Sequence, residues 1–145
     1  KSSFSSSIPY DEDEGSCMIV IATDAPLSNR NLKRMAKRVD HAFGRVGAYS
    51  SNGSGDYAII FSTSKPQSSD KKSFTRKEIK NNSMNGLFMA TVEATEEAII
   101  NSLFMAETVS SKYGKMEELP VYETMKILKK YKALNWNKKL YPWKK

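Results

Sequence analysis

Two short, continuous apolar runs constrain the fold most strongly: CMIVIA at residues 17–22 and YAIIFST at residues 57–63. Runs of this length without polar alternation are typical of strands that are covered on both faces. Two strands cannot supply neighbours and a cover on each face by themselves. We therefore expect either further strands in the irregular segments or a sheet that another chain completes.

Helical periodicity follows the first apolar run. Pro26, Ser28 and Asn29 are start signals for a helix. Apolar residues then recur at three- and four-residue steps opposite a basic face. We therefore expect one amphipathic helix that ends near Gly44 or Gly47.

The sequence pattern from residue 64 onward predicts a polar loop followed mostly by helix. Residues 64–83 are rich in Lys, Ser and Asn, and we expect a long exposed loop with room for a short helical turn. The longest helical pattern begins at residue 85, with Gly114 as its expected C-cap. Pro120 is expected to open a shorter helix over residues 121–131. With the two strands, these helices predict an α/β fold.

Composition excludes several kinds of site. The chain has 145 residues, which fits one domain with a modest core. Its single cysteine, Cys17, excludes an internal disulfide framework and a multi-cysteine zinc site. Its single histidine, His41, argues against a histidine-rich metal site and excludes a triad that needs a second imidazole.

The formal net charge of +7 has two interpretations: a surface for nucleic acid or acidic membranes, or an ordinary solvated surface. The C-terminal tail interleaves Lys with Trp136, Tyr141 and Trp143, a pattern that can bind single-stranded nucleic acid. No apolar run approaches about 20 residues, and residues 1–10 lack the apolar stretch of a signal peptide. We expect no membrane association and a cytoplasmic location.

The Gly15-Ser16 pair stands directly before the first apolar run. Either it is an ordinary strand start, or the bond between the two residues is cut and Ser16 becomes a new N-terminus. A serine hydroxyl is a weak nucleophile until a base takes its proton. His41 lies in the helical pattern beside Asp40, and no lysine is marked by a motif. A freed Ser16 α-amine, with a reference pKa of about 7.7–8.0, is a base within the same residue.

Several motifs follow one another along the chain: Gly15-Ser16 with its apolar run, ATDAPL at 22–27, NGSGD at 52–56, FSTS at 61–64 and VEATEEAIINSL at 92–103. In this order and spacing they resemble the β-chain of the DmpA family, the L-aminopeptidase/D-esterases and β-peptidyl aminopeptidases. The resemblance runs from Gly15 to about Pro120, which is most of the chain.

The resemblance implies a self-processing enzyme. Family members are made as one precursor that cleaves itself between a Gly and a Ser, and the first residue of the smaller β-chain is the nucleophile. These positions match Gly15 and Ser16, so residues 1–15 are expected to be a polar leader and residues 16–145 the β-chain portion of the catalytic domain. The family fold is a four-layer αββα sandwich that resembles the N-terminal nucleophile hydrolases. Its members assemble as oligomers of αβ units and need no metal, so we expect an α-chain partner and no cofactor.

The NGSGD motif supplies two further candidate residues. The family places a second serine and a carboxylate near the nucleophile, and these match Ser54 and Asp56. Ser54 can donate a hydrogen bond toward Ser16 or its amine, and Asp56 can hold Ser54 or orient an ammonium. Asp56 also suits a turn that begins a strand. Cys17, beside the cut site, is more typical of a small buried hydrophobe than of a nucleophile.

The expected reaction removes N-terminal residues from short peptides, amides or esters by attack of Ser16 Oγ. Acyl transfer to an amine, as in the similarly built ornithine acetyltransferases, stays open, and a basic nucleic-acid-binding module is the alternative from another class. While residues 1–15 stay attached, the Ser16 nitrogen is an amide and cannot act as a base. We expect this chain alone to be inactive.

Overall fold

The computed structural model describes residues 15–65, 68–69 and 72–134. Most of the expected polar leader and the basic aromatic tail with Trp136, Tyr141 and Trp143 lie outside the described residues. The chain divides into two compact units, Lys1–Ile99 and Ile100–Lys145, and each is described by itself.

A parallel pair of strands organises the first unit. Strand β1 (Met18–Thr23) pairs with β2 (Tyr57–Ser62), in a register that runs from Met18 opposite Tyr57 to Thr23 opposite Ser62. Both strands fall on the two apolar runs, and the predicted α/β class is confirmed. A parallel pair places the residues that precede both strands at one edge of the sheet. The segments around Ser16 and Asp56 therefore meet there.

Two helices connect the strands where the sequence predicts one. Helix α1 (Asn29–Ala36) and helix α2 (Val39–Arg45) are separated by a turn. At this turn the Arg38 N–H bonds to the Met35 carbonyl, one residue short of the helical partner, Arg34. The Arg38 guanidinium donates instead to the Arg34 carbonyl at 3.1 Å, which leaves that acceptor satisfied and allows the break.

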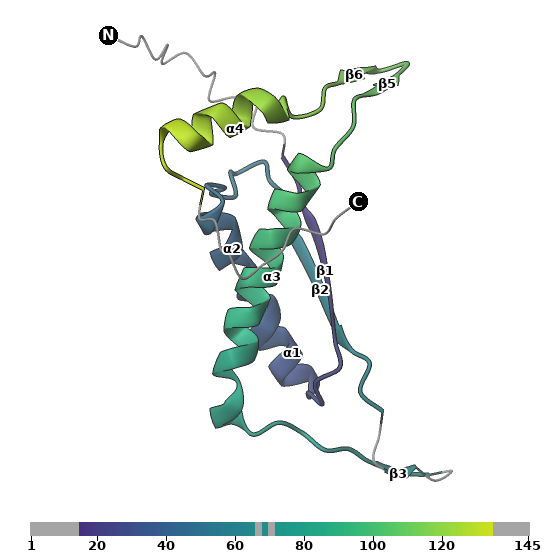
Figure 1. The fold of residues 1–145 in the computed structure, drawn as a ribbon. Helices are drawn as coiled ribbons and strands as arrows, with labels where there is room; N and C mark the ends of the chain where they lie inside the picture. The colour runs from purple at the N-terminus through teal and green to yellow at the C-terminus, as the bar shows by residue number, and fades with distance from the viewer. Residues whose placement is uncertain (1–14, 66–67, 70–71, 135–145) are drawn as a thin grey trace. The chain divides into compact units, whose positions relative to one another are not determined.

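The helices cover one face of the strand pair. Figure 1 shows α1, α2 and the first part of α3 (Asn85–Phe104) on the same side of β1 and β2. Leu27, Met35 and Met84 form the buried cluster, and Ile60 of β2 packs against it. This cluster is the core that holds the helical layer on the sheet.

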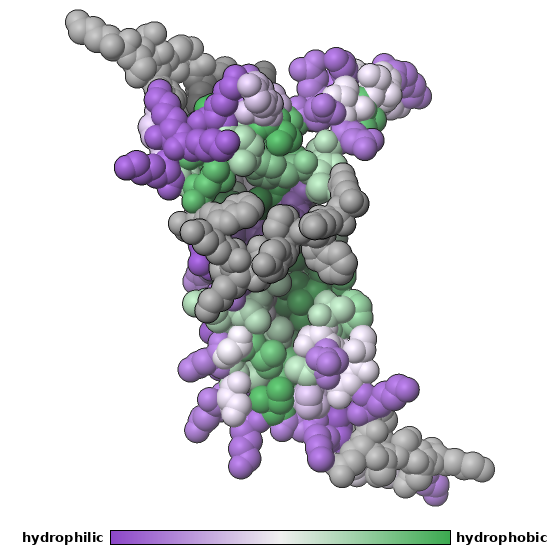
Figure 2. All heavy atoms as spheres, in the orientation of Figure 1, coloured by the Kyte–Doolittle hydropathy of each residue, from purple (hydrophilic) through white to green (hydrophobic). Residues whose placement is uncertain are grey.

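The opposite face of the strand pair is bare, so the described residues cover each strand on one face and leave the other open to the second alternative, a sheet that another chain completes. Exposed and half-buried side chains alternate along both strands. The exposed apolar face consists of Met18, Val20, Tyr57, Ile59 and Phe61. Val20 is 64% exposed and Ile59 is 54% exposed, because no described element packs on them. Figure 2 shows that hydrophobic residues reach the surface on the helical side as well.

The polar segment after β2 is tied to α1 by a carboxylate. It contains the short antiparallel pair β3 (Ser68–Ser69) and β4 (Phe74–Thr75), and the 3-10 turn η1 (Asn81–Ser83). Glu78 accepts hydrogen bonds from the Ser28 hydroxyl and from the Asn31 amide. The C-terminal part of the expected long loop is therefore held against the start of α1 by the hydrogen bonds of Glu78.

Asn31 is the buried member of this network, with 3% of its surface exposed. Its amide nitrogen donates to Glu78 at 2.9 Å and its oxygen accepts from Arg34 at 2.9 Å. We expect Asn31→Ala to lower the free energy of unfolding by about 1–3 kcal/mol, because a buried side chain and its two hydrogen bonds to the charged groups of Glu78 and Arg34 are lost. Urea unfolding of the protein that carries this chain measures it. Arg30→Ala, on the exposed side of α1, should change stability by less than about 0.5 kcal/mol, and equal losses would contradict the assignment.

The second unit holds the end of α3, a hairpin and one helix. The expected role of Gly114 as a helix C-cap is wrong, because α3 ends at Phe104 and Gly114 begins a strand. Strand β5 (Val109–Ser111) pairs with β6 (Gly114–Met116), and Gly114 takes a φ of 143° beside the turn. The run Thr-Val-Ser-Ser favours extended backbone over helix, which ends the helical pattern early.

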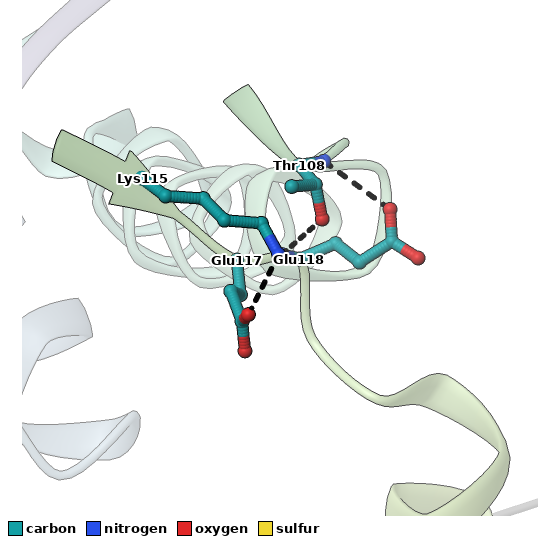
Figure 3. Close-up of polar contacts among 4 residues, drawn as sticks. All are labelled: Thr108, Lys115, Glu117 and Glu118. Carbon is teal, nitrogen blue, oxygen red and sulfur yellow. Dashed lines mark hydrogen bonds and ion pairs between the residues drawn. The ribbon is translucent and has the colours of Figure 1, made fainter. Parts of the chain in front are cut away.

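Reciprocal hydrogen bonds close the base of this hairpin, as Figure 3 shows. The Thr108 N–H donates to the Glu118 carboxylate at 3.2 Å, and the Glu118 N–H donates to the Thr108 hydroxyl at 3.1 Å. Lys115 pairs with Glu117 at 2.9 Å. Helix α4 (Val121–Lys130) follows Pro120, as the sequence predicts.

Candidate functional site

Ser16 lies directly before β1, at the sheet edge where the NGSGD loop enters β2. The Gly55 N–H donates a hydrogen bond to Ser16 Oγ at 3.1 Å. The next ladder bond, from the Tyr57 N–H to the Cys17 carbonyl at 2.9 Å, fixes the two segments against each other. A Cβ on residue 55 would lie 3.4 Å from Ser16 Oγ, so a glycine leaves room beside the hydroxyl.

Asp56 joins the two segments through its carboxylate. Its Oδ1 accepts the Cys17 N–H at 3.0 Å, and its Oδ2 accepts the Ser54 hydroxyl at 2.8 Å. Hydrogen bonds from Ser50 first, then from Ser54 and the Cys17 N–H, hold the pKa of Asp56 below its ordinary value, against a smaller opposing effect of burial. The carboxylate therefore stays ionised and keeps the amide that follows Ser16 in place.

Ser54 makes a different contact from the one expected of it. Its hydroxyl proton goes to Asp56, and the hydrogen bond to Ser16 Oγ comes from the backbone of Gly55. With its proton committed, the Ser54 oxygen is left as an acceptor. An oxygen that acts as an acceptor can pair with the N–H of an ammonium group, whereas it has no proton to donate to the Ser16 hydroxyl oxygen.

A pocket of about 440 Å³ opens beside Ser16. The candidate residues from the sequence all line it: Gly15, Ser16, Ser54 and Asp56. Its apolar part comes from side chains that the sequence did not single out, namely Phe43, Val46 and Ile99. The structure thus brings the whole predicted set together at one open cavity.

Sequence reasoning missed two groups at this site. One is the backbone N–H of Gly55, which no residue type reveals. The other is Ser50, whose side chain bonds to Asp56 and whose backbone has a φ of 51°. Ser50 begins the stretch SSNGSGD at residues 50–56, whose Ser, Asn, Gly and Asp residues are typical of a turn. A serine in such a stretch carries no signal of its own.

Other titratable residues lie elsewhere or act differently. His41 is exposed on α2 and is not among the residues that line the pocket. Cys17 is half-buried and contacts Asp56 through its backbone. Glu96 on α3 pairs with Arg45 at 3.1 Å, which gives this carboxylate a structural partner.

Among the described residues, no group of three or more His, Cys, Asp or Glu side chains is arranged to hold a metal ion. In the same residues, no helix is both long enough and apolar enough to cross a membrane.

The fold and the site define an α/β protein with a serine at a strand start beside a hydroxyl–carboxylate pair. The sequence model of peptidase family S58 matches residues 2–117. The chain belongs to peptidase family S58, and the resemblance to the DmpA family is confirmed.

Known relatives agree with this assignment. The beta-peptidyl aminopeptidase BapA of Sphingosinicella microcystinivorans is 41% identical over 124 residues, which are 83% of this chain and 31% of that protein. The PH0078 protein from Pyrococcus horikoshii OT3 is similar in structure with a TM-score of 0.71 and 41% identity, over 79% of this chain and 34% of that one.

A further solved structure bears on the fold class. The L-aminopeptidase D-Ala-esterase/amidase from Ochrobactrum anthropi matches with a TM-score of 0.67 and 26% identity, over 77% of this chain and 33% of its own. It is described as a prototype for the serine aminopeptidases and a variant of the Ntn hydrolase fold. This chain spans about a third of the length of each of these relatives.

Proposed function

We propose that this chain is the nucleophile-bearing part of a self-processing serine aminopeptidase. The observation that carries the proposal is the position of Ser16: its Oγ lies 3.1 Å from the Gly55 N–H, at the start of a strand, beside an amide that Asp56 holds. Membership of family S58 supports the same function. Residues 1–15 are then a leader and residues 16–145 the β-chain portion.

The first reaction is cleavage of the Gly15-Ser16 bond. Ser16 Oγ attacks the Gly15 carbonyl carbon, the amide C–N bond breaks, and an ester forms between Gly15 and Ser16 Oγ. The hydroxyl proton ends on the departing Ser16 nitrogen. Water then hydrolyses the ester and leaves a Gly15 carboxylate and a free Ser16. The Gly55 N–H orients the attacking Ser16 Oγ through its hydrogen bond. The Asp56 carboxylate accepts the Cys17 N–H and so fixes the backbone that follows Ser16.

The second reaction is turnover of substrate. The freed Ser16 amine accepts the hydroxyl proton as Oγ attacks the carbonyl of an N-terminal residue, and it returns that proton to the leaving amine or alcohol. Water releases the acyl group. Ser54, whose proton is committed to Asp56, accepts a hydrogen bond from the amine. The substrate class is short peptides, amides or esters, and transfer to a second amine is the related alternative.

An α-chain from the same precursor is the proposed partner. The apolar face of β1 and β2 has no cover in the described residues, and this chain has about a third of the length of its relatives. Burying this face against a second sheet would produce the four-layer αββα sandwich, because each sheet needs a layer on both sides. Native mass measurement of the complete protein would give the number of αβ units.

The intact mass of the complete precursor tests the proposal. We expect two fragments that meet at Gly15-Ser16 and that stay together under native conditions. We also expect release of p-nitroaniline from an aminoacyl p-nitroanilide, and none from its N-acetylated form. An added amino acid separates the two reaction types, because a transferase passes the acyl group to its amine whereas a hydrolase releases free acid. An unbroken chain that turns over the substrate would contradict the mechanism.

A further inference from the structure

Ser50 has a backbone conformation that a serine seldom adopts. Its φ of 51° lies in the left-handed region, where among the described non-glycine residues only Lys132 joins it. That region is unfavourable for a non-glycine residue, because its Cβ crowds the backbone carbonyl oxygen. Such a residue persists where its surroundings hold it, and it often lies at a functional site.

Ser50 contacts the candidate functional site through Asp56. Its side chain forms a hydrogen bond with the Asp56 carboxylate, and this bond contributes most to the lowered pKa of Asp56. Ser50 also lines the pocket beside Ser16, together with Ser54 and Asp56.

Ser50 and Ser54 flank one tight turn. The Ser54 N–H bonds to the Ser51 carbonyl at 2.9 Å and closes the turn between them. Both flanking hydroxyls then reach the same carboxylate, which also accepts the Cys17 N–H. Two oxygens that accept three donors from two segments have little freedom to rotate.

We propose that Ser50 is a positioning residue for the nucleophile, acting through the Asp56 carboxylate on the amide that follows Ser16. The inference rests on the proposed function and adds a residue to its site. In this arrangement the left-handed backbone of Ser50 aims its hydroxyl at Asp56, and Asp56 orients the segment from Ser16 to Cys17.

Three substitutions in the complete protein separate positioning from mere stability. Ser50→Gly removes the hydroxyl but suits the positive φ, so we expect an unchanged or raised Tm. The rate of Gly15-Ser16 splitting and kcat should fall about tenfold, with KM within about twofold, because a hydrogen bond to a charged group is lost. Ser50→Ala should lower the same rates and also Tm. Ser50→Asn, which tolerates a positive φ and has an N–H donor, should recover most of the rate.

Asn52→Ala is the matched control, since Asn52 is exposed in the same turn and outside the pocket lining. Splitting at the wild-type rate in Ser50→Gly would overturn the inference and leave the proposed function intact. Loss of rate in Ser50→Gly that Ser50→Asn does not restore would also overturn it. A wild-type precursor that neither splits nor turns over substrate would refute the proposed function, and this inference with it.

Discussion

Replacing Ser16 with alanine is expected to leave the complete protein as one unbroken chain without measurable turnover, at least about 10⁴-fold below wild type. In the proposed mechanism, the substitution removes the atom that attacks the Gly15 carbonyl and later carries the acyl group. Ser16 is exposed, and within the described residues its Oγ accepts one hydrogen bond, from the Gly55 N–H, so the fold should be unaffected. Intact mass measures the splitting, and a p-nitroanilide assay with circular dichroism measures turnover and fold.

Cys17→Ser is the informative control for Ser16→Ala. The Cys17 group that contacts Asp56 is its backbone N–H, which the substitution keeps. We expect splitting and turnover to survive. A protein that stops splitting when Cys17 is changed, and continues when Ser16 is changed, would assign the nucleophile to the sulfur instead.

Strands β1 and β2 and most of the helices could be predicted because their signals are local. Continuous apolar runs marked β1 and β2, and Pro120 marked the start of α4. The break between α1 and α2 could not, because it depends on the Arg38 guanidinium replacing a backbone donor at the Arg34 carbonyl. The hairpin of β5 and β6 was missed since a glycine with positive φ serves a helix end and a tight turn equally well.

The burial of the sheet could not be read from the sequence of this chain. Apolar residues on both sides of β1 and β2 predict a cover on each face, and the described residues supply one. The sequence pattern indicates that both faces of the strands are buried in the complete protein. In the structure, the described residues bury only one of them. The same mismatch supports a second chain.

The site could be predicted in its side chains but not in its geometry. The order of motifs pointed to Ser16, Ser54 and Asp56, and the parallel register explains why they meet at one edge. The direction of the Ser54 hydroxyl and the Gly55 N–H depend on the loop backbone. A sequence motif gives the residue types, but it does not show which hydroxyl donates a hydrogen bond to which oxygen.

Asp56→Asn should lower both splitting and turnover by on the order of 10²-fold. Three donors converge on the carboxylate, from Ser50, Ser54 and the Cys17 N–H. An amide of the same size offers one oxygen and one NH₂ group, so at least one donor then faces another donor. Intact mass and the p-nitroanilide assay at neutral pH measure both losses. Asp56→Glu keeps the charge and should retain more activity than Asp56→Asn.

The pH dependence of stability gives Asp56→Asn a second, independent readout. Because the folded-state pKa of Asp56 lies below its ordinary value of 3.8, its contribution is present above that value and is lost as pH falls through the folded-state pKa. The Tm difference between wild type and Asp56→Asn should therefore be largest near neutral pH and should shrink as the pH falls below 3.8 and through the folded-state pKa, because the wild-type carboxyl then takes up its proton. A difference that stays constant across this range would mean that the ionised carboxylate does not hold the loop against the strand that follows Ser16.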